Sequence, residues 1–195
     1  GIEAITGVRP ALEVCDCADY TAMKAVFDKY GRIKAAIHFA AYKAVGESVD
    51  KPLAYYQNNL QSLITVMRLL ADAGSKGFVF SSSCTVYGQP DVLPVTEDAP
   101  VKQAMSPYGN TKQIGEEIIR DFSHTHSGSR HALLRYFNPV GAHPTALIGE
   151  IQPIPQNLVP YITQTAIGKR PQLTVFGNDY DTRDGAQMRW LMRVF

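Results

Sequence analysis

Apolar residues along this chain fall into two alternating patterns. Short runs that are apolar throughout predict strands buried on both faces, and longer stretches with apolar residues three and four positions apart predict helices. The predicted strands span 11–16, 35–41, 77–83, 131–138 and 172–176. The predicted helices span 19–30, 52–74, 106–126 and 157–170. This alternation indicates an α/β fold with a parallel sheet and helices on both faces.

Helix boundaries and one irregular stretch divide the chain further. Pro52 suits a first helical turn and Gly74 a helix end, while Ser106 and Pro107 suit an N-cap and a first helical position. The stretch 139–156 is rich in proline and carries neither apolar pattern. It therefore predicts a border between a sheet domain, 1–138, and part of a smaller domain, 139–195.

Composition excludes some classes of function. With 195 residues, the chain is long enough for a sizeable core. A formal net charge of +1 gives no electrostatic reason to expect a nucleic acid or an acidic membrane surface as partner. Three cysteines, an odd number, fit a reducing, cytoplasmic location. Cys15 and Cys17 lack a second ligand pair nearby, so we expect no metal site.

Polar residues follow the predicted strands at the points where ligands bind in open parallel sheets. They are Asp16, Lys43, the run Ser81–Ser83 with Thr85, and Asn138. His38 lies inside a buried strand, and we interpret it as a core histidine.

A tyrosine and a lysine four residues apart occur three times, as Tyr20/Lys24, Tyr30/Lys34 and Tyr108/Lys112. The first pair lies in a surface helix, and Gly31 interrupts the second. Tyr108 and Lys112 lie one turn apart on one helix face, and a βα unit would bring the serine strand end beside them.

These residues suit proton transfer. Lowering the pKa of a tyrosine from about 10 to about 7 requires roughly 4 kcal/mol. One ammonium about 4 Å away supplies about that much at an effective dielectric near 20. Lys112 would then activate Tyr108 as a base, with Ser83 as a bridge to a substrate hydroxyl. The alternative is an ordinary helix start with a packed tyrosine and a solvated lysine.

Six segments together carry a family resemblance. They are "IHFAAYKAVGESVDKPLAYYQNNL", "FVFSSSCTVYG", "SPYGNTK", "LLRYFNPVGAHP", "NLVPYI" and "VFGNDYDTRDG". In this order they resemble the UDP-glucose 4-epimerases of the extended short-chain dehydrogenase/reductase family. The residues "SCT" at 83–85 disfavour another member of that family, a sugar-nucleotide dehydratase or reductase.

The resemblance implies a Rossmann-like fold and an isomerase of galactose metabolism that interconverts UDP-galactose and UDP-glucose with NAD. Tyr108, Lys112, Ser83 and Thr85 would be catalytic. Besides Ser83, Tyr108 and Lys112, the implied NAD-binding residues are Asp16, Cys17, Phe39, Ala40, Ala41, Lys43, Asn58 and Phe137. Besides Ser83 and Tyr108, the implied UDP-sugar residues are Asn138, Asn157, Leu158, Thr174, Val175, Phe176 and Arg189.

The chain also departs from the family. The first two strands, with their Gly-x-x-Gly-x-x-Gly turn, have no counterpart, so we expect an internal fragment whose strand 11–16 is detached and whose strand 35–41 has one bare edge. The segment 184–195 also leaves the family pattern. In the family, the helices at 52–74 and 106–126 pack against a partner in a homodimer. A second hypothesis is therefore a non-catalytic remnant that acts as a dimerisation or regulatory module.

Overall fold

The computed structural model describes residues 1–150, 155, 157–175, 177–183, 185 and 191–193. It divides into two compact units, one formed by Leu12–Tyr136 and the other by Gly1–Ala11 with Phe137–Phe195. Each unit has its own small parallel sheet.

The unit Leu12–Tyr136 is built on three parallel strands in the order β1-β2-β3. Residues Ala35–His38 of β1 lie opposite the first four residues of β2, and all seven residues of β2 pair with β3. The strands are β1 (Ala35–His38), β2 (Gly77–Ser83) and β3 (Arg130–Tyr136). The helices are α2 (Tyr20–Tyr30), α3 (Val45–Asp50), α4 (Pro52–Asp72), the 3₁₀ helix η1 (Cys84–Tyr87) and α5 (Pro107–Thr125).

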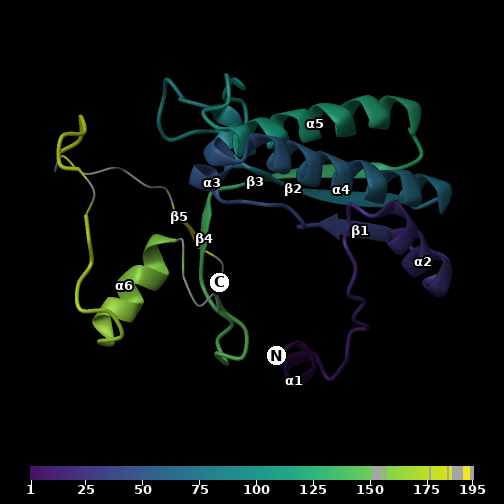
Figure 1. Ribbon diagram of the computed structural model, residues 1–195, viewed down its shortest axis with the longest axis horizontal. Coiled ribbons are helices and arrows are strands. Elements are labelled where there is room, and N and C mark those ends of the chain that lie inside the picture. Colours follow the sequence, from purple (N-terminus) through teal and green to yellow (C-terminus); the bar gives the residue numbers. More distant parts are fainter. Residues whose placement is uncertain (151–154, 156, 176, 184, 186–190, 194–195) are drawn as a thin grey trace. The chain divides into compact units, whose positions relative to one another are not determined.

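The core of this unit lies between one face of the sheet and the helices α4 and α5, which run side by side along it (Figure 1). Leu63 of α4, Phe80 of β2 and Ile119 of α5 are each 3% exposed or less. Gly115 lets α5 approach the sheet, because a Cβ there would lie 2.8 Å from Cζ of Phe80. The α/β fold with a parallel sheet is confirmed.

The sequence predicts helices on both faces of this sheet. Within this unit, α4 and α5 cover one face. Ile37 of β1, on the other face, is 63% exposed. Among the described strands, β1 pairs only with β2, so its other edge is bare, as predicted.

The predicted strand 11–16 is wrong, because these residues form no regular structure. Leu12 and Val14 are 84% and 93% exposed. A strand is held by hydrogen bonds to a neighbour, and within the described residues the sheet ends at β1. An apolar run without a pairing partner therefore stays irregular.

The second unit contains α1 (Ile2–Thr6), β4 (Asn138–Val140), α6 (Leu158–Ala166) and β5 (Leu191–Arg193), with β4 and β5 parallel. The predicted strand 172–176 is not found, since 172–175 are irregular and exposed; Phe176 lies outside the described residues. The sequence predicted neither α1, α3 nor η1, because helices of four to six residues are too short for a periodic signal.

Candidate active site

The candidate site lies at the carboxyl end of β2, where α5 begins. Ser106 caps α5, its Oγ accepting the Gly109 N–H at 3.1 Å, and Pro107 occupies the first turn. This start directs Tyr108 and Lys112 toward the end of β2. The Nζ of Lys112 donates to the Ser81 carbonyl at 2.7 Å and lies 5.7 Å from the centre of the Tyr108 ring.

Lys112 is a buried amine, with 4% of its surface exposed. The Phe80 ring lies 4.8 Å from its Nζ and forms an apolar floor beneath it. Burial lowers the pKa of Lys112 to about 8, because the ammonium loses its hydration. The alternative of a solvated lysine at an ordinary helix start does not describe this residue.

Tyr108 does not have the lowered pKa that the sequence argument assigned to it. Burial raises its pKa, and a side-chain hydrogen bond with Ser83 offsets part of the rise. The Lys112 ammonium is directed at the Ser81 carbonyl, and burial is the largest influence on the pKa of Tyr108.

Ser83 and Thr85 complete the group on the strand side. Ser83 is 8% exposed, and its Oγ accepts the Thr85 N–H at 3.2 Å, which fixes the start of η1. The Oγ1 of Thr85 is buried without a hydrogen-bond partner among the described residues. Because a buried hydroxyl without a partner is costly, this atom is suited to receive a ligand's polar group.

The loop after β1 supplies the next set of predicted residues. Phe39, Ala40 and Lys43 are exposed there, and Ala41 is half-buried. The loop is held by Asn59, a residue that the sequence analysis missed. Asn59 accepts the Tyr42 N–H at 2.8 Å and donates to the Tyr42 carbonyl at 3.0 Å.

Asn59 also connects this loop to α5, because its Nδ2 lies 3.2 Å from Oγ1 of Thr111. The predicted residue Asn58 donates to Asn59 at 3.0 Å and is half-buried. Adjacent asparagines on one helix carry no periodic signal that separates a ligand contact from a structural one, so the sequence could not rank them.

Two further predicted residues lie in the irregular segment before α2. Asp16 is exposed, and its Oδ1 accepts the Ala18 N–H at 2.8 Å, which shapes a turn. Cys17 is half-buried, and burial raises the pKa of its thiol.

His38 is confirmed as a core histidine. It is 5% exposed and stacks on Phe80, with ring centres 6.2 Å apart. Burial, followed by the Lys112 charge, lowers its pKa to about 4, so it is neutral at physiological pH.

In the second unit, three predicted substrate residues converge. Asn138, Asn157 and Leu158 line one pocket of about 380 Å³, together with Glu150. The Nδ2 of Asn157 donates to Glu150 at 3.1 Å. Phe137, the predicted nicotinamide neighbour, directly precedes Asn138 and is half-buried.

Two of the remaining predicted substrate residues lie outside that pocket, and two are not described. Thr174 and Val175 are exposed and do not line it. Phe176 and Arg189 lie outside the described residues.

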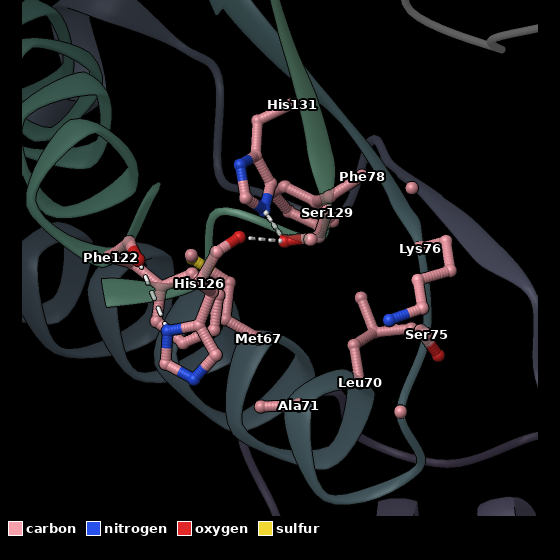
Figure 2. Close-up of a pocket in the computed structure, with 13 residues that line it drawn as sticks. Met67, Leu70, Ala71, Ser75, Lys76, Phe78, Phe122, His126, Ser129 and His131 are labelled. Atoms are coloured by element: carbon pink, nitrogen blue, oxygen red, sulfur yellow. Dashed lines mark hydrogen bonds between the residues drawn. The ribbon is translucent and has the colours of Figure 1, made fainter. Parts of the chain in front are cut away.

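A separate pocket of about 160 Å³ lies beside the amino end of β2, away from Ser83 (Figure 2). Its floor includes Met67, Leu70 and Phe78. The His131 ring contacts the hydroxyls of Ser123 and Ser129. These groups are satisfied within the protein, and the pocket contributes nothing to the candidate site.

The fold and this geometry define the class: an α/β protein in which a serine, a tyrosine and a buried lysine lie together at the carboxyl edge of a parallel sheet. The profile of the NAD dependent epimerase/dehydratase family matches residues 3–192. The chain belongs to this family.

Known relatives agree with this assignment. UDP-glucose 4-epimerase 2 of Arabidopsis thaliana is 50% identical over 190 residues, which cover 96% of this chain and 53% of that protein. UDP-glucose 4-epimerase of Homo sapiens is 48% identical over 194 residues, covering 99% of this chain and 56% of that protein. The chain thus spans about half the length of the curated relatives it matches.

Solved structures are also similar. The crystal structure of UDP-glucose 4-epimerase from Bifidobacterium longum in complex with NAD⁺ and UDP matches with a TM-score of 0.92 and 43% identity, covering 98% of this chain and 57% of that one. Among the described residues, none of the helices combines the length and apolar character needed to cross a membrane.

Proposed function

We propose that this chain carries the proton-transfer half of a UDP-glucose 4-epimerase, which interconverts UDP-galactose and UDP-glucose with NAD as cofactor. The names of its relatives support this activity. The observation that carries the proposal is the convergence of Ser83, Tyr108 and the buried Lys112 at the carboxyl end of β2.

The residues around this convergence fit a dinucleotide. The backbone of the loop Phe39–Lys43 is accessible yet held by Asn59, as a surface for a ribose and its phosphates requires. Lys112, Asn58 and Phe137 would hold the nicotinamide end, and Asp16 with Cys17 the adenine end. NAD, when bound, supplies a hydride acceptor for C4 of the hexose and a positive charge beside the phenol.

The chain's own residues would handle the proton and the 4-oxygen. Tyr108 would accept the 4-hydroxyl proton and return it to the oxygen after the sugar has turned over. Ser83, whose hydroxyl already lowers the pKa of Tyr108, would bridge the phenol to that oxygen. The unpartnered Oγ1 of Thr85 would gain a partner in the same 4-oxygen. Lys112 would contribute a fixed positive charge that favours the phenolate.

The pocket lined by Asn138, Asn157 and Leu158 would take the UDP part of the substrate. Two side-chain amides and an apolar residue suit a uracil ring, which presents donors, acceptors and a flat apolar face. Thr174, Val175, Phe176 and Arg189 remain predicted contacts of the same ligand.

The proposal is tested in a completed protein, in which this chain is joined to the segments of the Arabidopsis relative that it does not match. A coupled assay measures UDP-glucose formed from UDP-galactose. We expect turnover in the completed protein and its loss in the Ser83→Ala variant. A folded, NAD-containing completed protein without turnover would contradict the activity and favour the non-catalytic module.

We propose further that the protein is a homodimer through the outer face of α4. Leu53 and Ile64, 11 positions apart, lie on one face of this helix and are 82% and 46% exposed. Light scattering of the completed protein should show a dimer, and Ile64→Asp should shift it to a monomer. A monomeric parent protein would exclude the dimer. The three free thiols are consistent with the proposed cytoplasmic location.

A further inference from the structure

Three residues of α5 at four-residue intervals contact three consecutive residues of β2. Tyr108 lies beside the Ser83 hydroxyl, which lowers the pKa of the phenol; Lys112 donates to the Ser81 carbonyl, and Glu116 accepts the Ser82 hydroxyl at 2.6 Å. Positions four apart share a helix face, so a single face of α5 is paired with the end of β2. The first two contacts belong to the site described above, and the third does not.

Glu116 is 1% exposed, and all its acceptor positions are used. Arg135 of β3 donates from Nε to Oε1 at 2.9 Å and from Nη2 to Oε2 at 2.7 Å. Arg120 adds a contact to Oε2 at 2.6 Å. Burial raises the pKa of Glu116, but the hydrogen bonds from Arg135 and Ser82 outweigh it and hold that pKa below its usual value.

The pairing of β2 with β3 places two partners of Glu116 side by side. Ser82 and Arg135 are directly paired across β2 and β3, and both bind Glu116. Apolar packing between a helix and a sheet has no preferred register, whereas a fork of charged hydrogen bonds fits in one position only. A slip of α5 by one residue moves Tyr108 by about 1.5 Å, enough to draw the phenol away from the Ser83 hydroxyl.

We infer that Ser82 and Glu116 are positioning residues, whose hydrogen bond fixes the register of α5 on β2 and thereby holds Tyr108 against Ser83. The expected effect of this hydrogen bond on catalysis rests on the proposed function. Its expected effect on the position of α5 does not. Removing the Ser82 hydroxyl takes away the contact of Glu116 with β2 but leaves Glu116 paired with both arginines, so no buried charge loses its partners.

The first test needs no activity and uses the 195-residue chain itself. The chain is prepared with ¹³C-labelled tyrosine rings, the Tyr108 signal is assigned with Tyr108→Phe, and the signal is titrated with pH. Ser82→Ala should shift the pKa of Tyr108 upward, because the hydrogen bond from Ser83 lowers it. Ser82→Thr, which keeps the hydroxyl, should restore the parent value.

The second test measures kinetics in the completed protein. Ser82→Ala should lower kcat roughly tenfold, as a small misplacement of a catalytic group does. KM for UDP-galactose should change less than about twofold, and the Tm should move by no more than about 4 °C. Ser123→Ala is the matched control. Its hydroxyl also joins α5 to β3, through His131 at 2.7 Å, but outside the site, and kcat should not change.

An unchanged pKa of Tyr108 in Ser82→Ala would overturn the inference, because the register would then not depend on this contact. A shifted pKa with parent kcat would overturn its catalytic part. If the completed parent protein shows no epimerase activity, the proposed function fails while the titration still decides the register.

Discussion

At the scale of single residues, the site is a set of polar groups kept in apolar surroundings. Lys112 lies on the Phe80 ring and Tyr108 is partly buried, so each disfavours its charged form. Such displaced pKa values concentrate at functional sites, where a proton must move near neutral pH.

Tyr108→Phe in the completed protein should lower kcat by about 100-fold or more, since general base catalysis contributes about that much. NAD should remain bound, because the ring and its packing are kept. The checks are single-turnover rates and the cofactor content of the purified protein. Tyr20→Phe, in the surface helix α2, is the control and should leave turnover unchanged. Near-parent turnover in Tyr108→Phe would remove the tyrosine from the mechanism.

Lys112→Met should reveal the stability cost of burying the amine. The folded pKa is about 8, below the ordinary 10.5 of the unfolded chain, so the unfolded state binds more protons between these values. Relative to the Lys112→Met variant, the parent should therefore gain ~3 kcal/mol in its free energy of unfolding as the pH rises from 8 to 10.5. Urea unfolding at several pH values measures this difference. If the difference in the free energy of unfolding between the two proteins does not change with pH, the Lys112 amine is hydrated in the folded chain.

At the scale of elements, α5 links the chemistry to the fold. Its first turn holds Tyr108, its middle packs on Phe80 through Gly115, and Glu116 ties it to β2 and β3. The close approach at Gly115 leaves no room for a Cβ, while Gly46 in α3 has nothing within 4 Å of such an atom.

Gly115→Ala should lower the free energy of unfolding by about 1–3 kcal/mol, the usual cost of overpacking a core. Gly46→Ala is the matched control and should be neutral or stabilising by up to about 1 kcal/mol, because alanine favours helix. Urea denaturation of both variants gives the comparison. A Gly115→Ala protein as stable as the parent would show that α5 moves away from Phe80 without loss.

At the scale of the whole molecule, the described three-stranded sheet has no strand paired to the outer edge of β1, and one of its faces is incompletely covered. Ile37 is 63% exposed on that face. The sequence contains no glycine-rich turn of the kind that holds a dinucleotide's pyrophosphate at a helix N-terminus.

The isolated 195-residue chain should therefore bind NAD at least about 100-fold more weakly than the completed protein. Losing two hydrogen bonds to charged phosphate oxygens costs about 3 kcal/mol, which corresponds to this factor. It should also fail to convert UDP-galactose. Isothermal titration and the coupled assay measure both. Equal NAD affinity in the two proteins would show that the loop after β1 and Lys112 carry the binding alone.

The sequence alone determined most of the parallel sheet, its long helices and the central chemistry of the site. Uninterrupted apolar runs and helical spacing are local signals, so β1, β2, β3, α4 and α5 could be predicted from them. The Ser-Pro start of α5 put Tyr108 and Lys112 on one face, and the βα connection brought Ser83 beside them.

Only the tertiary structure decided the rest, because it depends on neighbours that are distant in the chain. The apolar run 11–16 has the pattern of a strand but pairs with none of the strands that the structure describes. The pKa of Tyr108 follows from burial and from where the Lys112 amine points, and neither is visible in their spacing. Asn59 and Glu116 look like ordinary helix residues in sequence. Asn59 matters because the fold brings the loop after β1 against it. Glu116 matters because the fold brings Ser82 and Arg135, which are 53 positions apart, into contact with it.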